Sequence, residues 1–359
     1  MLFVIIDLKK TDGELMMDLW QKLKEESRPI FLYGMGNGAD KILDECIRQG
    51  IEISGVFASD GFVRNQVFRG FTVESYSAVK EKNPDMIALL CFGSALENVI
   101  SSIKQKANEI TLFAPSVPVY GDKIFNADFY KNNKEKIRLA RSLFSDEKSK
   151  EVFDRIIEYR LSGEIGNLFE IETSRNDNYK LLNLNNEIFM DLGAYRGDTL
   201  SEVNSLCTVK EAIAVEPDLK SFNKLKENTE EIRNVTYLNC AVGEKDGETF
   251  FKKSRGRGSA VSDKGEKIPV RSVDSILGVG RVTYIKFDVE GNEKNAILGA
   301  EKTIKEHLPK MKIAAYHRSE DIFTLPLLIN EICGGYGFYL RHEPSLPDWD
   351  TDIIVIPKE

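Results

Sequence analysis

The sequence predicts an α/β protein with two doubly wound, Rossmann-like domains joined by a helical connector. Two stretches, one before residue 115 and one after residue 187, alternate short apolar runs with helical patterns. This alternation is typical of parallel sheets that carry helices on both faces. The stretch between them is charged and has helical periodicity. We therefore expect an N-terminal Rossmann-like domain of nucleotide-binding type at 1–121, a connector at 122–180 and a second α/β domain at 181–359.

Short apolar runs and three-to-four-residue periodicity define the elements of the first domain. In order, they are a helix at 13–26, a strand at 30–33, a helix at 37–49, a strand at 53–57, a helix at 75–83, a strand at 86–90, a helix at 96–107 and a strand at 110–113. The connector is expected to be helical because apolar positions such as Leu139, Val152 and Ile156 fit helical faces.

The second domain is expected to contain seven strands. These lie at 188–192, 211–216, 235–240, 282–288, 311–317, 336–341 and 352–356, with helices at 198–206, 218–231, 292–306 and 321–333. The glycine-rich segment 245–271 indicates hairpins and loops instead.

Length and composition exclude several classes of protein. A chain of 359 residues has room for two domains of roughly 100–200 residues each. The net charge of -8 argues against a non-specific nucleic-acid binder. An apolar stretch of the roughly 18 residues that indicates a membrane span is missing from the sequence. The five scattered cysteines indicate reduced thiols. We expect a cytoplasmic protein without nucleic-acid or membrane partners, and the sequence leaves the oligomeric state open.

A first glycine-rich turn follows the strand at 30–33. Its sequence, Gly34-Met35-Gly36-Asn37-Gly38-Ala39, matches the dinucleotide pattern, and Asp60 lies 21 residues after Ala39. In such a fold the glycines let the backbone approach a pyrophosphate, and the acid holds a ribose hydroxyl. One hypothesis is therefore an enzyme that binds NAD or a nucleotide sugar at Gly34–Asp60. The alternative is a tight turn whose glycines serve packing only.

A second turn joins the strand at 188–192 to the helix at 198–206. The strand ends in Asp191, a Gly193-x-x-x-Gly197 pattern follows, and Asp198 or Thr199 is expected to cap the helix. The glycines would let the main chain pass beside the methionine moiety of a cofactor. Asp191 would accept a hydrogen bond from its ammonium group, directly or through water.

The next strand ends complete this cofactor site at one rim of the sheet. Glu216 would accept two hydrogen bonds from a ribose diol, and the small residues of 239–243 leave room for an adenine. Together these strand ends predict S-adenosylmethionine as cofactor and disfavour a non-catalytic scaffold. The expected cofactor-binding residues are Asp191, Gly193, Ala194, Tyr195, Gly197, Asp198, Thr199, Glu216, Pro217, Asp218, Ala241, Val242 and Asp288.

These motifs resemble the FkbM family of class I S-adenosylmethionine-dependent methyltransferases. The matching pieces are DLGAYRGDT at 191–199, EPD at 216–218, NCAVG at 239–243, IKFDVEGNEKNAILGA at 285–300 and IAAYHRSEDIFTLPLLI at 313–329. The resemblance covers 187–357 and implies a seven-stranded class I methyltransferase fold. Some members resemble this chain in having an N-terminal Rossmann-like domain. The resemblance also implies O-methyl transfer to a hydroxyl of a sugar, glycan or natural-product acceptor.

Catalysis of that transfer would need a base near the acceptor hydroxyl. We expect His317, at the end of the fifth strand, to be the general base, with Asp288 and Glu290 positioning the acceptor or the base. Alternatively, His317 caps the following helix or pairs with Glu320, and the two carboxylates bind backbone amides of the Gly291 turn. No metal ligand is assigned, although Mg²⁺ bound by these three side chains stays open. Tyr179 is expected on the acceptor side.

Overall fold

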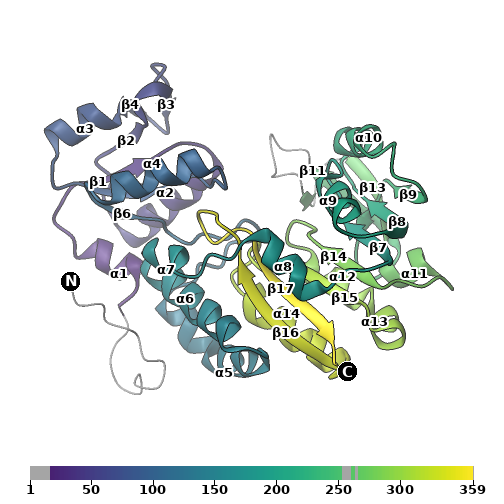
Figure 1. The fold of residues 1–359 in the computed structure, drawn as a ribbon. Helices are drawn as coiled ribbons and strands as arrows, with labels where there is room; N and C mark the ends of the chain where they lie inside the picture. The colour runs from purple at the N-terminus through teal and green to yellow at the C-terminus, as the bar shows by residue number, and fades with distance from the viewer. Residues whose placement is uncertain (1–16, 253–259, 263–265, 359) are drawn as a thin grey trace.

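The computed structural model describes residues 17–252, 260–262 and 266–358, which form three sheets (Figure 1). The first sheet has the order β3-β4-β2-β1-β5-β6. Its strands are β1 (Ile30–Tyr33), β2 (Gly55–Ala58), β3 (Val67–Phe68), β4 (Phe71–Ser75), β5 (Ile87–Leu90) and β6 (Thr111–Phe113). All pair in parallel except β3, which pairs antiparallel with β4 at the edge. The Rossmann-like alternation predicted for this part is confirmed.

The first sheet carries α1 (Leu19–Lys24), α2 (Asn37–Gln49), α3 (Tyr76–Lys82), α4 (Glu97–Ala107) and the single turn η1 (Asp60–Phe62). The helix expected at 13–26 is shorter, because Asp18 caps its first turn. Residues 13–16 of that prediction lie outside the described residues. The strands β3 and β4 were missing from the prediction, because this small hairpin is half-exposed and lacks an apolar run.

The connector is helical, as predicted, and packs on the second domain. It comprises α5 (Ala127–Leu143), α6 (Glu147–Ser162), α7 (Gly166–Phe169) and α8 (Arg175–Leu182). Helix α5 packs against α14 (Asp321–Ile332), and α6 packs against β16 (Tyr336–His342). The hydroxyl of Ser149 in α6 accepts a hydrogen bond from the amide of Leu340 at 3.0 Å.

The largest sheet contains the seven strands predicted for the second domain. Its order is β16-β17-β15-β14-β7-β8-β9, and β17 runs antiparallel to both of its neighbours. The strands besides β16 are β7 (Glu187–Leu192), β8 (Val209–Val215), β9 (Val235–Leu238), β14 (Tyr284–Phe287), β15 (Lys310–Ala314) and β17 (Thr351–Pro357). The chain order reverses between β7 and β14, and ligands of doubly wound sheets bind at that switch point.

The remaining helices and a small sheet complete the second domain. The helices are α9 (Asp198–Leu206), α10 (Leu219–Asn228), α11 (Val273–Leu277), α12 (Glu293–Leu298) and α13 (Glu301–His307). The single helix expected at 292–306 is two helices, which Gly299 separates. The hairpins expected within 245–271 form a sheet of β10 (Ala241–Val242), β11 (Gly247–Lys252), β12 (Ala260–Ser262) and β13 (Glu266–Arg271). Across the described residues, every helix is too short or too polar to cross a bilayer.

The loop between β16 and β17 joins the second domain to the first sheet and the connector. In Figure 1 this hairpin is yellow, and its loop reaches toward the purple and blue N-terminal part. Ser94 and Leu346 exchange backbone hydrogen bonds of 2.7 and 3.0 Å. Arg160 of α6 pairs with Asp348 at 2.6 Å, and both side chains are buried. A further contact, from the amide of Tyr120 to the carbonyl of His317 at 2.8 Å, brings the first domain beside the rim of the large sheet.

Candidate active site

The turn between β7 and α9 passes close to the end of β14. Gly193 has φ +79, and a Cβ there would lie 1.8 Å from the carbonyl oxygen of Asp288. Gly197 has φ +89 and stands at the N-cap of α9 without a side-chain cap. The cap expected of Asp198 or Thr199 is therefore wrong, since both residues already lie in the helix. Asp198 instead places its charge in the first turn, where the helix dipole favours an acid.

A side chain at a positive φ costs roughly 1–3 kcal/mol of backbone strain. Replacing Gly193 with alanine should lower the free energy of unfolding by more than this amount. The added methyl group would have to displace the β14 end as well as adopt a positive φ. Gly36→Ala is the matched control, because Gly36 has φ +110 but nothing within 4 Å of its Cβ position. Urea denaturation of both variants measures the difference. Equal losses of stability would show that the close approach to Asp288 is unimportant.

Asp191 and Lys286 form a buried ion pair beneath this turn. Asp191 is fully buried, and the Lys286 ammonium lies 3.3 Å from its Oδ1. The same ammonium donates to the carbonyl of Gly193 at 3.0 Å and lies 3.3 Å from Oδ2 of Asp288. Burial opposes the charge of Lys286, but the two acids outweigh it and raise its pKa. Lys286 thus occupies the place beside Asp191 that we expected for the cofactor ammonium. A contact of the buried Asp191 with the cofactor, directly or through water, stays a prediction.

Glu216 lies at the end of β8, beside the same turn. Its two carboxylate oxygens accept hydrogen bonds from the amides of Tyr195 at 2.9 Å and Asp218 at 2.8 Å. Asn239 fixes the following peptide by donating to the carbonyls of Glu216 and Pro217. Burial raises the pKa of Glu216 to about 7, although the two amides act in the opposite direction. The carboxylate is therefore tied to the turn and is only partly ionised at neutral pH.

S-adenosylmethionine binding through Glu216 should strengthen as pH rises through 7. The ribose diol needs the ionised carboxylate as acceptor. Below the pKa of about 7, the ionised fraction of Glu216 falls tenfold for each pH unit. Affinity at pH 6 is expected to be about tenfold lower than at pH 8. Calorimetric titration at both values measures this, with Glu216→Gln as the variant that removes the titrating group. The same pH slope in that variant would contradict the assignment.

The other expected cofactor residues line the rim with their backbones or small side chains. Ala194 is buried under the turn, and Ala241 and Val242 form the short strand β10. The side-chain amide of Asn292 donates to the carbonyl of Val242 at 2.7 Å. Asp218 caps α10 by accepting from the amide of Ser221 at 2.8 Å. Binding of S-adenosylmethionine by this set stays a prediction, which rests on Glu216 and the two glycines of the turn.

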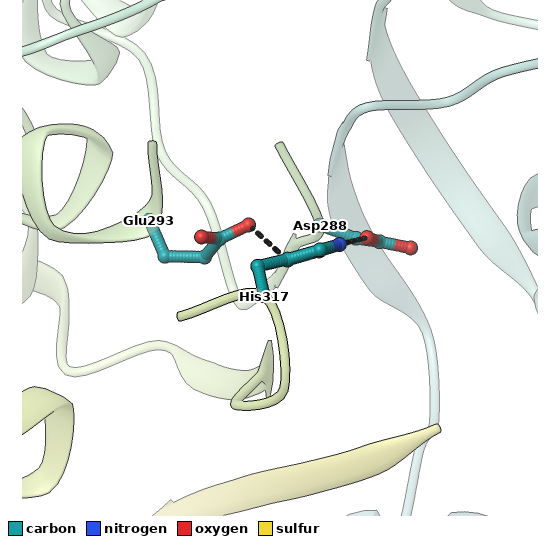
Figure 2. Close-up of side chains that lie close together, drawn as sticks. All are labelled: Asp288, Glu293 and His317. Atoms are coloured by element: carbon teal, nitrogen blue, oxygen red, sulfur yellow. Dashed lines mark ion pairs between the residues drawn. The ribbon is translucent and has the colours of Figure 1, made fainter. Parts of the chain in front are cut away.

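His317 lies between two groups of carboxylates (Figure 2). Its Nδ1 is 2.9 Å from Oε1 of Glu293, and its Nε2 is 3.6 Å from Asp288 and 3.7 Å from Glu290. The same Glu293 oxygen accepts from the amides of Val289 and Gly291, so the helix start holds it in place. Burial lowers the pKa of His317, but Glu293 and the other carboxylates outweigh it and raise the pKa to about 10.

The base role expected of His317 does not fit these surroundings. A histidine with a pKa of about 10 is an imidazolium at neutral pH and has no free site for a proton. Neither alternative role fits either, because the ring contacts acids rather than the α14 terminus, and Glu293 rather than Asp288 binds the amides of the Gly291 turn. The charges of Lys286 and His317 overcome burial and lower the pKa of Asp288, which stays ionised and one-third exposed.

The histidine cluster does not suit a single Mg²⁺ ion. Asp288, Glu293 and His317 place potential ligand atoms within 4.8 Å of one another. However, Glu293 faces one ring nitrogen and Asp288 faces the other, as Figure 2 shows. One ion can bind only one nitrogen of an imidazole, and Mg²⁺ prefers oxygen ligands in octahedral geometry. We therefore derive no step through a metal.

A small polar pocket of about 70 Å³ adjoins Asp288 and the cofactor turn. Tyr179 lines it and donates to Glu202 at 3.0 Å, and its expected place on the acceptor side stays a prediction. Its lining also includes Thr199, Lys286, Asp288, Lys312, Tyr316, Asp350 and Asp352. The sequence patterns did not single out Lys286 and Lys312. The sign that could have found them is a lysine within a predicted strand. The sequence alone could not place Asp350, because it lies in the loop before β17.

Two of the three glycines of the first turn, Gly34 and Gly38, make close packing contacts. A Cβ at Gly38 would lie 2.4 Å from the carbonyl oxygen of Cys91, and one at Gly34 would lie 2.5 Å from the ring of Phe92. Asp60, expected to hold a ribose, accepts hydrogen bonds from the amide and hydroxyl of Ser77. These contacts satisfy the motif without a nucleotide, so the NAD or nucleotide-sugar hypothesis gains no support.

Comparisons with known proteins match the second domain and the overall fold. Residues 191–338 match the family model described as the methyltransferase FkbM domain. A crystal structure of methyltransferase FkbM from Methylobacillus flagellatus KT has a TM-score of 0.73 and 20% identity, over 97% of this chain and 96% of its own. That likeness extends the shared fold through the six-stranded sheet, the connector and the seven-stranded sheet. A search of curated proteins found no match.

Two other solved structures cover about half of the chain. Fibrillarin from Aeropyrum pernix, with bound S-adenosyl-L-methionine, has a TM-score of 0.33 and 13% identity over 51% of this chain and 74% of its own. A precorrin-6y C5,15-methyltransferase from Geobacter metallireducens has a TM-score of 0.34 and 12% identity over 52% and 92%. Residues 191–338 thus resemble the methyltransferase FkbM domain, and the near-complete match above extends the likeness in fold to the rest of the chain.

Proposed function

We propose that this chain is a methyltransferase that transfers a methyl group from S-adenosylmethionine to a hydroxyl of a sugar, glycan or natural-product acceptor. The match of residues 191–338 to the methyltransferase FkbM domain supports the cofactor. The acceptor hydroxyl is our inference, and one observation carries it. Asp288 is an ionised, partly exposed carboxylate that stands at the end of β14 beside the cofactor turn and the polar pocket.

The cofactor, when bound, supplies an electrophilic methyl group on a sulfonium. A neutral hydroxyl is a weak nucleophile, so a carboxylate that accepts its proton during the transfer speeds the reaction. Asp288 is the residue that we assign to this step. Glu290 lies 3.7 Å from Nε2 of His317, the ring nitrogen that faces Asp288. We assign it to orienting the acceptor.

His317 is a positioning residue in this account. As an imidazolium clamped by Glu293, it fixes Asp288 from one side while Lys286 fixes it from the other. Two cations keep the carboxylate ionised and aligned. That alignment matters because methyl transfer needs the acceptor oxygen, the methyl carbon and the sulfur in line.

The polar pocket favours a hydroxylated acceptor over an apolar one. Charged side chains from α8, α9, β14, β15 and the β17 loop line it. Carboxylates and ammonium groups at such a surface bind hydroxyl groups, whereas an apolar acceptor would displace their water without offering hydrogen bonds in return.

The test is a panel of acceptors incubated with the purified chain and S-adenosylmethionine. Mass spectrometry should find the gain of one CH₂ on sugars or polyhydroxylated acceptors, together with S-adenosylhomocysteine. Matched amino sugars and thiols, in which another nucleophile competes with the hydroxyls, identify the methylated atom. Methylation of nitrogen or sulfur in preference to oxygen would contradict the proposal.

A further inference from the structure

A larger hollow lies on the other side of the Gly291 turn. It has a volume of about 480 Å³ and lies between α5, the start of α12 and the start of α14. None of the catalytic or cofactor-binding residues expected above is among its described lining residues. Small-molecule sites usually have volumes of about 300–1,000 Å³, so the hollow is large enough for a ligand.

Positive charge dominates this hollow. Lys123, Lys136, Lys294 and Arg318 line it, against two acids. One acid, Glu320, pairs with Lys123 at 3.0 Å. Among the residues the structure describes, Lys136 and Lys294 take part in no ion pair. A cluster of unpaired cations in a chain of net charge -8 attracts an anion.

The second acid hardly offsets this charge. Asp321 is buried, and burial together with the charge of Glu293 raises its pKa to about 8. The raised pKa weakens the negative charge that Asp321 contributes to the hollow. Arg318, by contrast, is held in position, because its Nε donates to the carbonyl of Gly291 at 2.7 Å and its guanidinium lies 4.4 Å from the centroid of the Tyr120 ring. A cation that is already ordered loses little entropy when it binds a ligand.

Asparagine amides face the hollow from two helices. Asn132 and Asn133 belong to α5, and Asn292 and Asn295 lie at the start of α12. Asn295 donates to Asn292 at 2.7 Å, and Asn133 donates to the carbonyl of Phe129 at 2.9 Å, so two of the amides have fixed orientations. An amide both donates and accepts, which suits hydroxyl groups.

We propose that this hollow binds a sugar or polyol that carries a phosphate or carboxylate group. The anionic group would contact Lys136, Lys294 and Arg318, and the hydroxyls would contact the asparagines. This site is separate from the pocket beside Asp288, and the proposal does not depend on methyl transfer.

The test is calorimetric titration of the full chain with four probes: glucose 6-phosphate, glucuronate, glucose and inorganic phosphate. At least one of the two anionic sugars should bind at least tenfold more tightly than glucose and phosphate. Which of them binds identifies the anionic group. The affinity should fall as salt concentration rises.

Variants locate the binding. Lys136→Ala/Lys294→Ala should weaken binding of the anionic sugar at least tenfold, and Asn132→Ala should weaken it several-fold. Lys224→Ala/Lys226→Ala, on α10, is the matched control that should leave it unchanged. Unchanged S-adenosylmethionine affinity in each variant shows that the fold persists. The proposal is overturned if neither anionic sugar binds, if phosphate alone binds as tightly, or if the Lys136/Lys294 variant binds like the wild type.

Discussion

Replacing Glu216 with alanine is expected to weaken S-adenosylmethionine binding by about 30–1,000-fold. The carboxylate would accept both ribose hydroxyls, and it also accepts the amides of Tyr195 and Asp218. Losing these hydrogen bonds in a buried place should cost roughly 2–4 kcal/mol, which corresponds to that range of affinity. Calorimetric titration of the purified variant measures the loss.

Glu227→Ala is the control for this experiment. Glu227 is an exposed acid on α10, the helix that follows Glu216, and its partner is Lys224. Its removal should leave both stability and affinity close to those of the wild type, because exposed ion pairs contribute little. A loss of less than threefold in Glu216→Ala would show that the cofactor ribose binds elsewhere.

Replacing Asp288 with asparagine should lower kcat by about 10²–10⁴-fold, the usual contribution of a positioned base. The amide keeps the shape of the side chain and can still accept from Lys286, but it cannot take a proton. Cofactor affinity should therefore change little while turnover falls. Single-turnover kinetics at saturating acceptor, with the cofactor Kd measured in parallel, separates the two effects.

The matched control for that substitution is Glu306→Gln, which removes an exposed acid on α13. It should retain full turnover. If Asp288→Asn keeps kcat within fivefold of the wild type, the proton is accepted elsewhere. A loss of cofactor binding equal to the loss of turnover would instead make Asp288 a cofactor-binding residue.

Local sequence patterns predicted the sheet and the rim of the cofactor site. Each strand of the second domain is an apolar run, and polar or small residues follow where the strand ends. Parallel strands end at one edge, so Gly193, Glu216 and Asp288 could be brought together from spacing alone. The break between α12 and α13 was not predicted. It lies at Gly299, where a Cβ would be 2.1 Å from the carbonyl oxygen of Gly243. That contact depends on tertiary packing.

The role of His317 could not be predicted for the same reason. Its position at a strand end was evident, but its protonation depends on Glu293, which reaches the ring from α12, the helix after β14. Likewise, a lysine within the β14 run gave no sign that it would neutralise Asp191 from the adjacent strand. Charges brought together by folding determine the chemistry of each group.

The first glycine-rich turn has a pattern that two different roles share. Glycines that let a backbone approach a pyrophosphate also let a helix approach a strand, as Gly38 approaches Cys91. The pattern of residues is the same in both cases. In the structure Asp60 binds Ser77, so packing alone accounts for the motif.

Titration of the wild-type chain with S-adenosylmethionine, beside NAD(H) and a nucleotide sugar, tests the central claim most directly. We expect one S-adenosylmethionine bound per chain with micromolar affinity, competition by S-adenosylhomocysteine, and no binding of the other two. Binding of NAD(H) or the nucleotide sugar without binding of S-adenosylmethionine would contradict the account and move the active site to Gly34–Asp60.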